Sequence, residues 1–231
     1  MRKKLYLIPG TMCTEKLWTE ILPYLYDSLE LVYLDIPQGK NFDELAEHYH
    51  NIFGSDTVNL IGFSLGGYIA TYYAMLHPNQ IEKLFVISNS PTNLSVEELE
   101  QRSDILKYVK TYGYKGMSRN KVASLLDSKN QTDQLIDLIL EMDNALGESE
   151  FISQYKCTSE RVDLSQSIIQ FPFYTHLYYS DNDSLINSKW LNELDNISPR
   201  LSLISTSGSG HMLPLEKPRE LAQYINSWVE L

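Results

Sequence analysis

Residues 57–67 read TVNLIGFSLGG, an apolar run that passes directly into a short turn rich in glycine. The run predicts a buried β-strand, and the small and aromatic residues at 68–72 predict a helix. Ser64 therefore stands in a G-x-S-x-G pattern on a sharp strand-to-helix turn, where the flanking glycines carry no side chain that would clash. Such a turn exposes the serine hydroxyl at the sheet edge, so Ser64 is a candidate nucleophile. The alternative is an incidental serine in a Gly-rich turn.

Strand and helix patterns alternate through most of the chain. Short apolar runs rich in β-branched and aromatic residues predict strands at Leu5–Ile8, Leu29–Ile36, Thr57–Gly62, Lys83–Ser88, Phe173–Tyr179 and Leu201–Ser205. Segments with helical spacing lie at Lys16–Tyr26, Phe42–Phe53, Gly66–Leu76 and Arg219–Trp228. This order predicts an α/β fold, with a mostly parallel central sheet flanked by helices.

The region of about 91–170 interrupts this order, because it carries charged, helix-favouring segments and no clear strand. The segments are Val96–Tyr112, Lys115–Asp127, Gln131–Leu146 and Ser149–Cys157. Loops at the carboxyl ends of parallel strands border the ligand crevice of such a sheet. An insertion between two strands therefore predicts a helical cap or lid over one edge of the sheet. We expect residues 1–231 to form a single domain that includes this insertion.

Composition and charge argue against several classes of protein. The net charge of −11 disfavours nucleic acid as a partner, since nucleic acid binds clustered Lys and Arg. No apolar run approaches the roughly 18 residues that span a bilayer, and the first run stops at Pro9-Gly10 without a signal-peptide cleavage site. Cys13 and Cys157 offer at most one bridge and no metal or redox spacing. We expect a cytoplasmic protein with a small-molecule partner and no membrane partner; the oligomeric state stays open.

A serine is a poor nucleophile at neutral pH unless a base removes its proton. His211 is the candidate base, because it lies in a Gly-flanked loop, residues 207–212, between the last predicted strand and the closing helix. The chain order of serine, acid and then histidine also fits this role. A solvated loop histidine is the alternative. The remaining histidines favour structural or solvated positions; they are His48, His50, His77 and His176.

The imidazole needs an acid that fixes its tautomer and stabilises its protonated form. The strand that ends at Tyr179 is followed by Asp181 and Asp183, which compete for this role. We prefer Asp183, because the apolar pair at 185–186 that follows could anchor the turn. Asp181 would then cap or solvate the loop, and either aspartate could instead be a simple turn former.

Acyl transfer also needs hydrogen-bond donors for an oxyanion. One is the backbone N–H of Leu65, directly after the candidate nucleophile. The second is expected from the loop after the first strand, where Gly10 permits a backbone angle that turns the N–H of Thr11 or Met12 inward. The alternative reading of this loop is an ordinary Pro-Gly turn.

With these residues in hand, the chain resembles the α/β-hydrolase superfamily over nearly its whole length. Residues 7–18 resemble its oxyanion loop and first helix, with Pro9 where many members have histidine. Residues 62–67 resemble its nucleophile elbow, and residues 208–218 its histidine loop and final helix. Residues 34–39 are similar to its D-x-P-G-x-G turn, with Gln38 in place of a glycine. The acid turn departs from the pattern, because Ser180 replaces the usual glycine before the aspartate.

The resemblance implies a hydrolase of the α/β-hydrolase fold that needs no cofactor and no metal and carries a cap domain. Residues 161–163, Arg-Val-Asp, are similar to a pattern of some small esterase-like members, although Arg161 and Asp163 are close enough simply to pair. The resemblance does not fix the substrate.

Three functions fit these patterns. The first is hydrolysis of a carboxylic ester or thioester of a small molecule, with Ser64, His211 and Asp183 as a catalytic triad. The second is carbon–carbon bond hydrolysis or a lyase reaction of the menaquinone-synthase type on the same triad. The third is a ligand-binding member of the fold without catalysis. An acidic substrate would need cations in the insertion, although such a set is also an ordinary solvated face. The available ones are Arg102, Lys107, Lys110, Lys115, Arg119, Lys121, Lys129 and Arg161.

Overall fold

A computed structural model describes residues 2–231, and its centre is a sheet of parallel strands. The strands are β1 (Lys3–Ile8), β2 (Leu29–Tyr33), β3 (Val58–Phe63), β4 (Ile81–Ile87), β5 (Tyr174–Ser180) and β6 (Leu201–Thr206). They form one six-stranded sheet in the order β2-β1-β3-β4-β5-β6, and every pair is parallel. The predicted α/β fold with a parallel sheet is confirmed.

The strand order reverses between β1 and β3. The chain places β2 on one side of β1 and then returns to place β3 on the other side. The loops that leave the carboxyl ends of β1 and β3 consequently diverge, and open α/β sheets bind ligands at such switch points. The G-x-S-x-G turn follows β3 and the loop of residues 9–14 follows β1, so both candidate segments begin at this switch point.

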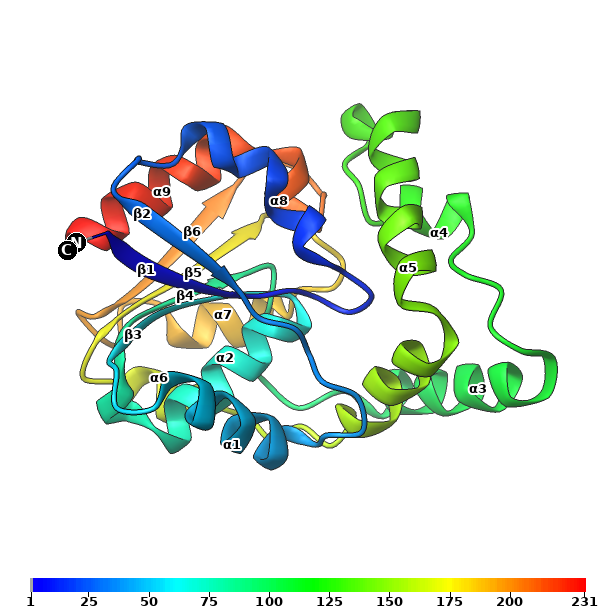
Figure 1. The fold of residues 1–231 in the computed structure, drawn as a ribbon, viewed down its shortest axis with the longest axis horizontal. Helices are drawn as coiled ribbons and strands as arrows, with labels where there is room; N and C mark the ends of the chain where they lie inside the picture. Colours follow the sequence, from blue (N-terminus) through cyan, green and yellow to red (C-terminus); the bar gives the residue numbers. More distant parts are fainter. Residues whose placement is uncertain (1) are drawn as a thin grey trace.

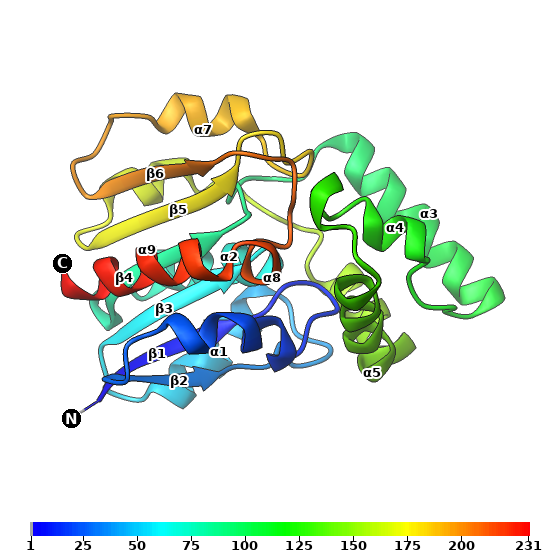
Figure 2. The same cartoon turned by 90° about the horizontal axis from the view of Figure 1, so that it is seen from above.

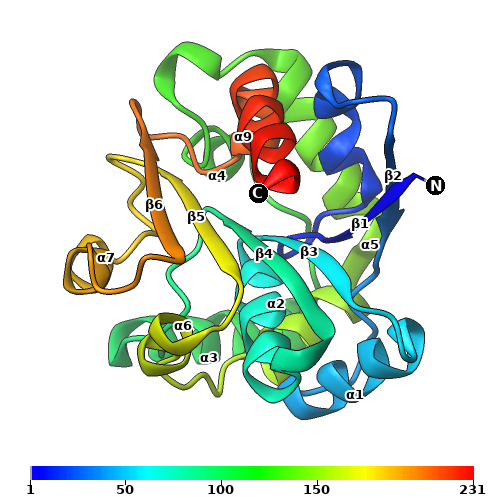
Figure 3. The same cartoon turned by 90° about the vertical axis from the view of Figure 1, so that its left-hand side faces the viewer.

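Helices cover both faces of the sheet (Figure 3). On one face lie α1 (Phe42–Phe53), α2 (Leu65–Leu76), α6 (Ser165–Gln170) and α7 (Ser188–Leu194). On the other face lie the 3₁₀ helix η1 (Glu15–Tyr24), α8 (Leu213–Glu216) and α9 (Pro218–Glu230). Each face buries its own apolar cluster, so the strands are covered on both sides, as a parallel sheet requires.

Four further helices form an insertion between β4 and β5, and the short η2 (Pro78–Gln80) lies between α2 and β4. The insertion contains α3 (Val96–Tyr112), α4 (Arg119–Ala123), η3 (Ser128–Asn130) and α5 (Asp133–Cys157), which we call the inserted helices. Figures 1 and 2 show that α3, α4 and α5 stand beyond the carboxyl ends of the strands, apart from the two sheet-covering layers. Ser95 and Glu98 form a reciprocal capping box that starts α3 at the predicted residue.

Several boundaries differ from the sequence predictions. β2 ends at Tyr33, before the expected Ile36, because its partner β1 turns away at Pro9 and the pairing stops at Leu7 with Tyr33. Helix α4 is much shorter than the predicted 115–127. The two helices predicted on either side of Gly147 are both present under the one label α5, and Gly147 between them has a non-helical conformation (φ 73°).

Within residues 2–231, no helix is both long and apolar enough to cross a membrane.

Candidate active site

The turn after β3 holds Ser64 in a left-handed backbone conformation (φ 49°, ψ −117°). The Ser64 N–H donates to the carbonyl of Ile87 at 2.8 Å, which ties the turn to β4. A Cβ added to Gly62 would lie 2.2 Å from the carbonyl oxygen of Gly66, and one added to Gly66 would lie 2.3 Å from that of Pro9. The glycines on both sides of Ser64 are therefore required by close backbone packing, which leaves its hydroxyl at the sheet edge.

His211 lies between Ser64 and Asp183. Its Nε2 is 3.0 Å from Ser64 Oγ, and its Nδ1 is 2.7 Å from Asp183 Oδ2. His211 and Asp183 are buried and Ser64 is partly exposed. Each distance falls in the range of a hydrogen bond. The structure thus brings together three side chains that the sequence proposed as a unit, in the order hydroxyl, imidazole and carboxylate.

In the turn after β5, the two candidate aspartates, Asp181 and Asp183, have different contacts. The two oxygens of Asp183 have different partners: Oδ1 accepts the N–H of Leu185 at 2.9 Å, and Oδ2 faces His211. Asp181 is exposed, and its backbone N–H donates to the carbonyl of Thr206 at the end of β6. Asp183 is the aspartate that contacts the imidazole.

The loop after β1 lies against the nucleophile turn. A Cβ on Gly10 would be 3.2 Å from Ser64 Cβ, and Met12 adopts a left-handed conformation (φ 54°). The Met12 N–H donates to Oε1 of Gln154 at 2.9 Å, whose Nε2 in turn donates to Glu150 at 2.7 Å. Both α5 side chains are buried.

The backbone N–H groups of Thr11 and Leu65 remain without a hydrogen-bond partner in the part of the chain that the structure describes. Leu65 is the first residue of α2, where helix geometry leaves the N–H free. Sequence reasoning named these donors but missed Gln154 and Glu150, because only the fold brings α5 to the β1 loop.

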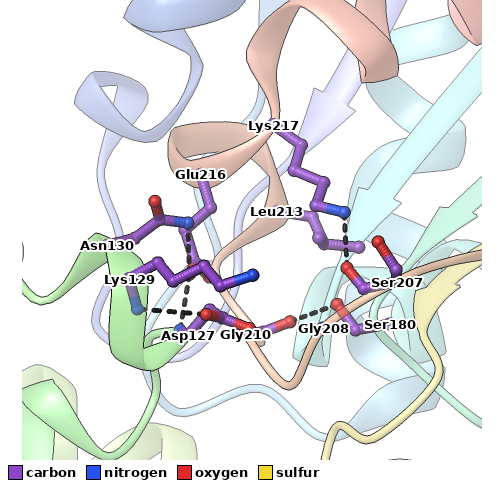
Figure 4. Close-up of a pocket in the computed structure, with 10 residues that line it drawn as sticks. All are labelled: Asp127, Lys129, Asn130, Ser180, Ser207, Gly208, Gly210, Leu213, Glu216 and Lys217. Carbon is purple, nitrogen blue, oxygen red and sulfur yellow. Dashed lines mark hydrogen bonds between the residues drawn. The ribbon is translucent and has the colours of Figure 1, made fainter.

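The inserted helices also hold the histidine loop, on the other side of the site. The His211 N–H donates to the carbonyl of Leu125 at 2.8 Å. The carboxylate of Glu216 accepts the N–H of Asp127 at 2.6 Å and that of Met212 at 3.0 Å, and Figure 4 shows the first of these links. Burial raises the pKa of Glu216, while these N–H donors act in the opposite direction. A cavity of about 310 Å³ lies beside this network, lined by polar groups such as Lys217.

A second cavity, of about 330 Å³, lies beside the β1 loop. It is lined by that loop, by residues 35–38 after β2, and by Leu146, Glu150 and Gln154 of α5. Ser64, Asp183 and His211 line neither cavity.

The described residues, 2–231, contain no group of three or more His, Cys, Asp or Glu arranged to hold a metal ion. Cys13 and Cys157 are both free thiols. Burial raises the pKa of Cys13 to about 12, so its thiol stays protonated at neutral pH although it lies in the β1 loop.

This fold and site define a class of protein. Residues 40–218 match the family described as alpha/beta hydrolase fold. The chain belongs to this family.

The chain is also similar to several known proteins, at low sequence identity or over part of their length. The biotin biosynthesis bifunctional protein BioHC of Teredinibacter turnerae is 22% identical, over 99% of this chain but 45% of its own length. A pimeloyl-[acyl-carrier protein] methyl ester esterase of Pseudoalteromonas atlantica is 30% identical, over 37% of this chain and 36% of its own length. Each match thus spans less than half of the relative. A thermophilic esterase from Thermogutta terrifontis has a TM-score of 0.86 at 17% identity, over 99% of this chain and 89% of that one, a likeness of fold.

Proposed function

We propose that this chain is a serine esterase that cleaves a carboxylic ester or thioester of a small molecule through an acyl-enzyme. The contacts from Ser64 Oγ to His211 and from His211 to Asp183, at 3.0 and 2.7 Å, carry the proposal. They supply a nucleophile, a base within reach of its proton, and an acid that orients the base. Two relatives are named as pimeloyl-[acyl-carrier protein] methyl ester esterases, which supports an ester as the substrate.

In the proposed reaction, Ser64 Oγ attacks the acyl carbon while His211 Nε2 takes the hydroxyl proton. His211 then gives this proton to the leaving alcohol or thiol as the bond to the acyl carbon breaks. A water molecule then attacks the acyl-enzyme, and His211 again takes the proton. The bond to Ser64 Oγ breaks, the acid is released, and His211 returns the proton to Ser64 Oγ. The carboxylate of Asp183 faces His211 and stabilises the imidazolium that forms in each step.

The oxyanion of each tetrahedral intermediate is assigned to the N–H groups of Leu65 and Thr11. Both are free of partners within the described chain, and both belong to the segments that meet beside Ser64. Met12 was the other candidate, but its N–H already donates to Gln154. Helix α2 also begins at Leu65, so its positive end faces the developing charge.

The test is labelling of the purified protein with a fluorophosphonate, together with release of nitrophenol from p-nitrophenyl butyrate. We expect the wild type to label and turn over, and Ser64→Ala to lose labelling and about 10⁴-fold or more in kcat. Ser55→Ala is the control, because Ser55 is an exposed serine that precedes β3, at the opposite end of that strand from Ser64, and should behave as wild type. A wild type that neither labels nor turns over would favour a ligand-binding protein instead.

A further inference from the structure

Two of the cations of the insertion differ from the others in burial. Arg102 and Arg161 are half-buried; Arg102 lies over Tyr155 of α5, and Arg161, which follows α5, lies over Tyr68 of α2. The others are exposed: Lys107, Lys110, Lys115, Arg119, Lys121 and Lys129. The exposed cations fit an ordinary solvated surface. Only the burial of Arg102 and Arg161 needs a specific explanation.

Arg161 lies over the ring of Tyr68, a residue of the helix that follows the nucleophile. Its guanidinium carbon is 5.0 Å from the centroid of the Tyr68 ring, and Tyr68 follows Ser64 by four residues on α2, about 6 Å along the helix axis. The Tyr68 hydroxyl is fixed by the backbone N–H and carbonyl of Val162, at 2.8 and 3.0 Å. Arg161 Nε donates to the carbonyl of Thr158 at 3.2 Å. The guanidinium is thus held in place on the side of α2 that faces the insertion.

Arg102 reaches the same region from α3. Its guanidinium carbon is 5.0 Å from the centroid of the Tyr155 ring, and it donates to Ser159 Oγ at 3.4 Å. Tyr155 stacks on Phe151 of α5, and both pack in the small apolar cluster that contains Met12 of the β1 loop. Arg102 therefore lies beside the cluster that packs on the β1 loop, and Arg161 lies beside Tyr68 of the helix that follows Ser64.

Neither guanidinium has an acidic partner. Among residues 2–231, no carboxylate lies within 4.0 Å of Arg102 or Arg161, whereas the exposed Arg119 pairs with both Asp133 and Asp137. Asp163, two residues from Arg161, bonds instead to Trp190 Nε1. This excludes the simple Arg161–Asp163 pair that the sequence allowed.

Holding two half-buried guanidiniums near each other has a free-energy cost, because each loses water and the two repel. Burial lowers the pKa of both guanidiniums, and the charge of Arg102 lowers that of Arg161 further. Glu98 has the opposite influence on both, but its Oε2 accepts the N–H of Ser95 at the start of α3. Two partly desolvated like charges are expected to require an anion that neutralises them.

We propose that Arg102 and Arg161 form a binding site for an anionic group of the substrate, a carboxylate or a phosphate, beside Tyr68 of α2 and Tyr155 of α5. This inference rests on the proposed esterase function and narrows its substrate to esters or thioesters with a negative charge remote from the scissile bond. Guanidinium groups suit such ligands, because their planar fork matches carboxylate and phosphate oxygens.

Matched substrates test the acyl side and the leaving-group side separately. Mono-p-nitrophenyl adipate is compared with p-nitrophenyl hexanoate, which replaces the remote carboxylate by a methyl group. Hexanoyl-coenzyme A is compared with hexanoyl-N-acetylcysteamine, which lacks the phosphates. In at least one pair, we expect Arg161→Gln and Arg102→Gln each to lower the ratio of kcat/KM, anionic over neutral, by about tenfold, mainly through KM. Arg161→Lys should recover part of this loss.

The control is Arg119→Gln, an exposed arginine of α4 whose loss should leave both ratios unchanged. A merely structural role for the pair predicts equal losses on anionic and neutral substrates, and that result overturns the proposal. A wild type that prefers the neutral member of both pairs also overturns it.

Calorimetric binding of adipate and of inorganic phosphate separates this proposal from the esterase proposal. If no ester is cleaved but one of these anions binds to wild type and not to Arg161→Gln, the anion site stands and the esterase function fails. If esters are cleaved and neither anion binds, the anion site fails and the esterase function stands.

Discussion

Two residues at the site hold backbone conformations that non-glycine residues rarely adopt. They are Ser64 and Met12, both with positive φ, on the two loops that meet at the switch point. Each such residue costs on the order of 1–3 kcal/mol and persists only where its surroundings fix it. For Ser64 the fixing contact is the bond to Ile87, and for Met12 it is the bond to Gln154. Gln154 is therefore a positioning residue in the proposed site.

Replacement of Gln154 by leucine tests this role. The change leaves the Met12 N–H buried without an acceptor, which should release the β1 loop and displace the Thr11 N–H. Because an oxyanion donor acts in the transition state, we expect kcat to fall by about tenfold or more with little change in KM. Steady-state kinetics on a p-nitrophenyl ester measure both parameters.

The control for this change is Gln134→Leu, at an exposed position of the same helix. It should keep wild-type kinetics. An unchanged kcat in Gln154→Leu, with the variant folded by circular dichroism, would show that the β1 loop holds its conformation without the amide.

Substitution of each acid-turn aspartate by asparagine separates their roles. Asp183→Asn keeps the shape of the side chain but removes the charge that faces His211, so we expect kcat to fall by about 10⁴-fold. Asp181→Asn changes an exposed side chain and should retain activity. Ester hydrolysis by the two variants, measured side by side, decides between them. A larger loss in Asp181→Asn would reverse the assignment.

Among the elements, the inserted helices contact both loops that flank Ser64. Helix α5 supplies Gln154 to the β1 loop, and the segment around η3 supplies the carbonyl of Leu125 to the histidine loop. We therefore expect the insertion to support the catalytic geometry as well as to cover it.

Glu216 of α8 links the inserted helices to the histidine loop, and its replacement tests whether that link supports the site. Its carboxylate joins Asp127 to Met212, and it fills the space in which a Cβ on Gly210 would stand, at 2.2 Å. Glu216→Ala leaves two N–H groups without their acceptor, so we expect a loss of about 1–3 kcal/mol in the free energy of unfolding and a lower kcat.

Urea denaturation and ester kinetics measure the two effects of Glu216→Ala. The exposed Glu47 of α1 provides the control, because Glu47→Ala should change neither. Loss of stability with full activity would mean that the histidine loop does not depend on this link.

For the whole molecule, the sheet is stabilised by an apolar cluster on each face, and His176 of β5 is buried beside Phe85. Burial, and then the charge of Lys83, lower the pKa of His176 from 6.5 to about 4. Between these two pH values the unfolded chain binds a proton at this histidine that the folded chain does not bind. The free energy of unfolding therefore decreases as pH falls from about 6.5 to about 4.

His176→Leu removes this proton uptake. We expect the variant to lose less stability than wild type as the pH is lowered from 6.5 to 4, measured by urea denaturation at intervals across that range. At pH 7 the comparison gives the effect of the substitution on packing alone. Parallel curves for the two proteins would show that His176 does not contribute to the acid sensitivity.

Local patterns predicted most of the fold and the three central side chains. The helix bounds of α1 and α3 follow directly from capping boxes that begin at Asn41 and Ser95. The turn around Ser64 could be predicted from the sequence, because close backbone packing requires glycine at fixed positions around the serine. The end of β2 could not be predicted from the sequence, because it depends on where the neighbouring strand β1 turns away.

By itself, then, the sequence determined the parallel α/β fold, the position of Ser64 on its turn, and His211 as the histidine of the last loop. These features arise from short-range constraints, namely hydrophobic periodicity, caps and glycine spacing. Only the tertiary structure decided that Asp183 rather than Asp181 contacts the imidazole and that Gln154 holds the N–H of Met12 from 142 residues away. It also decided that Arg102 and Arg161 lack acidic partners among residues 2–231. Those features depend on which distant segments meet in space, and no local pattern records that.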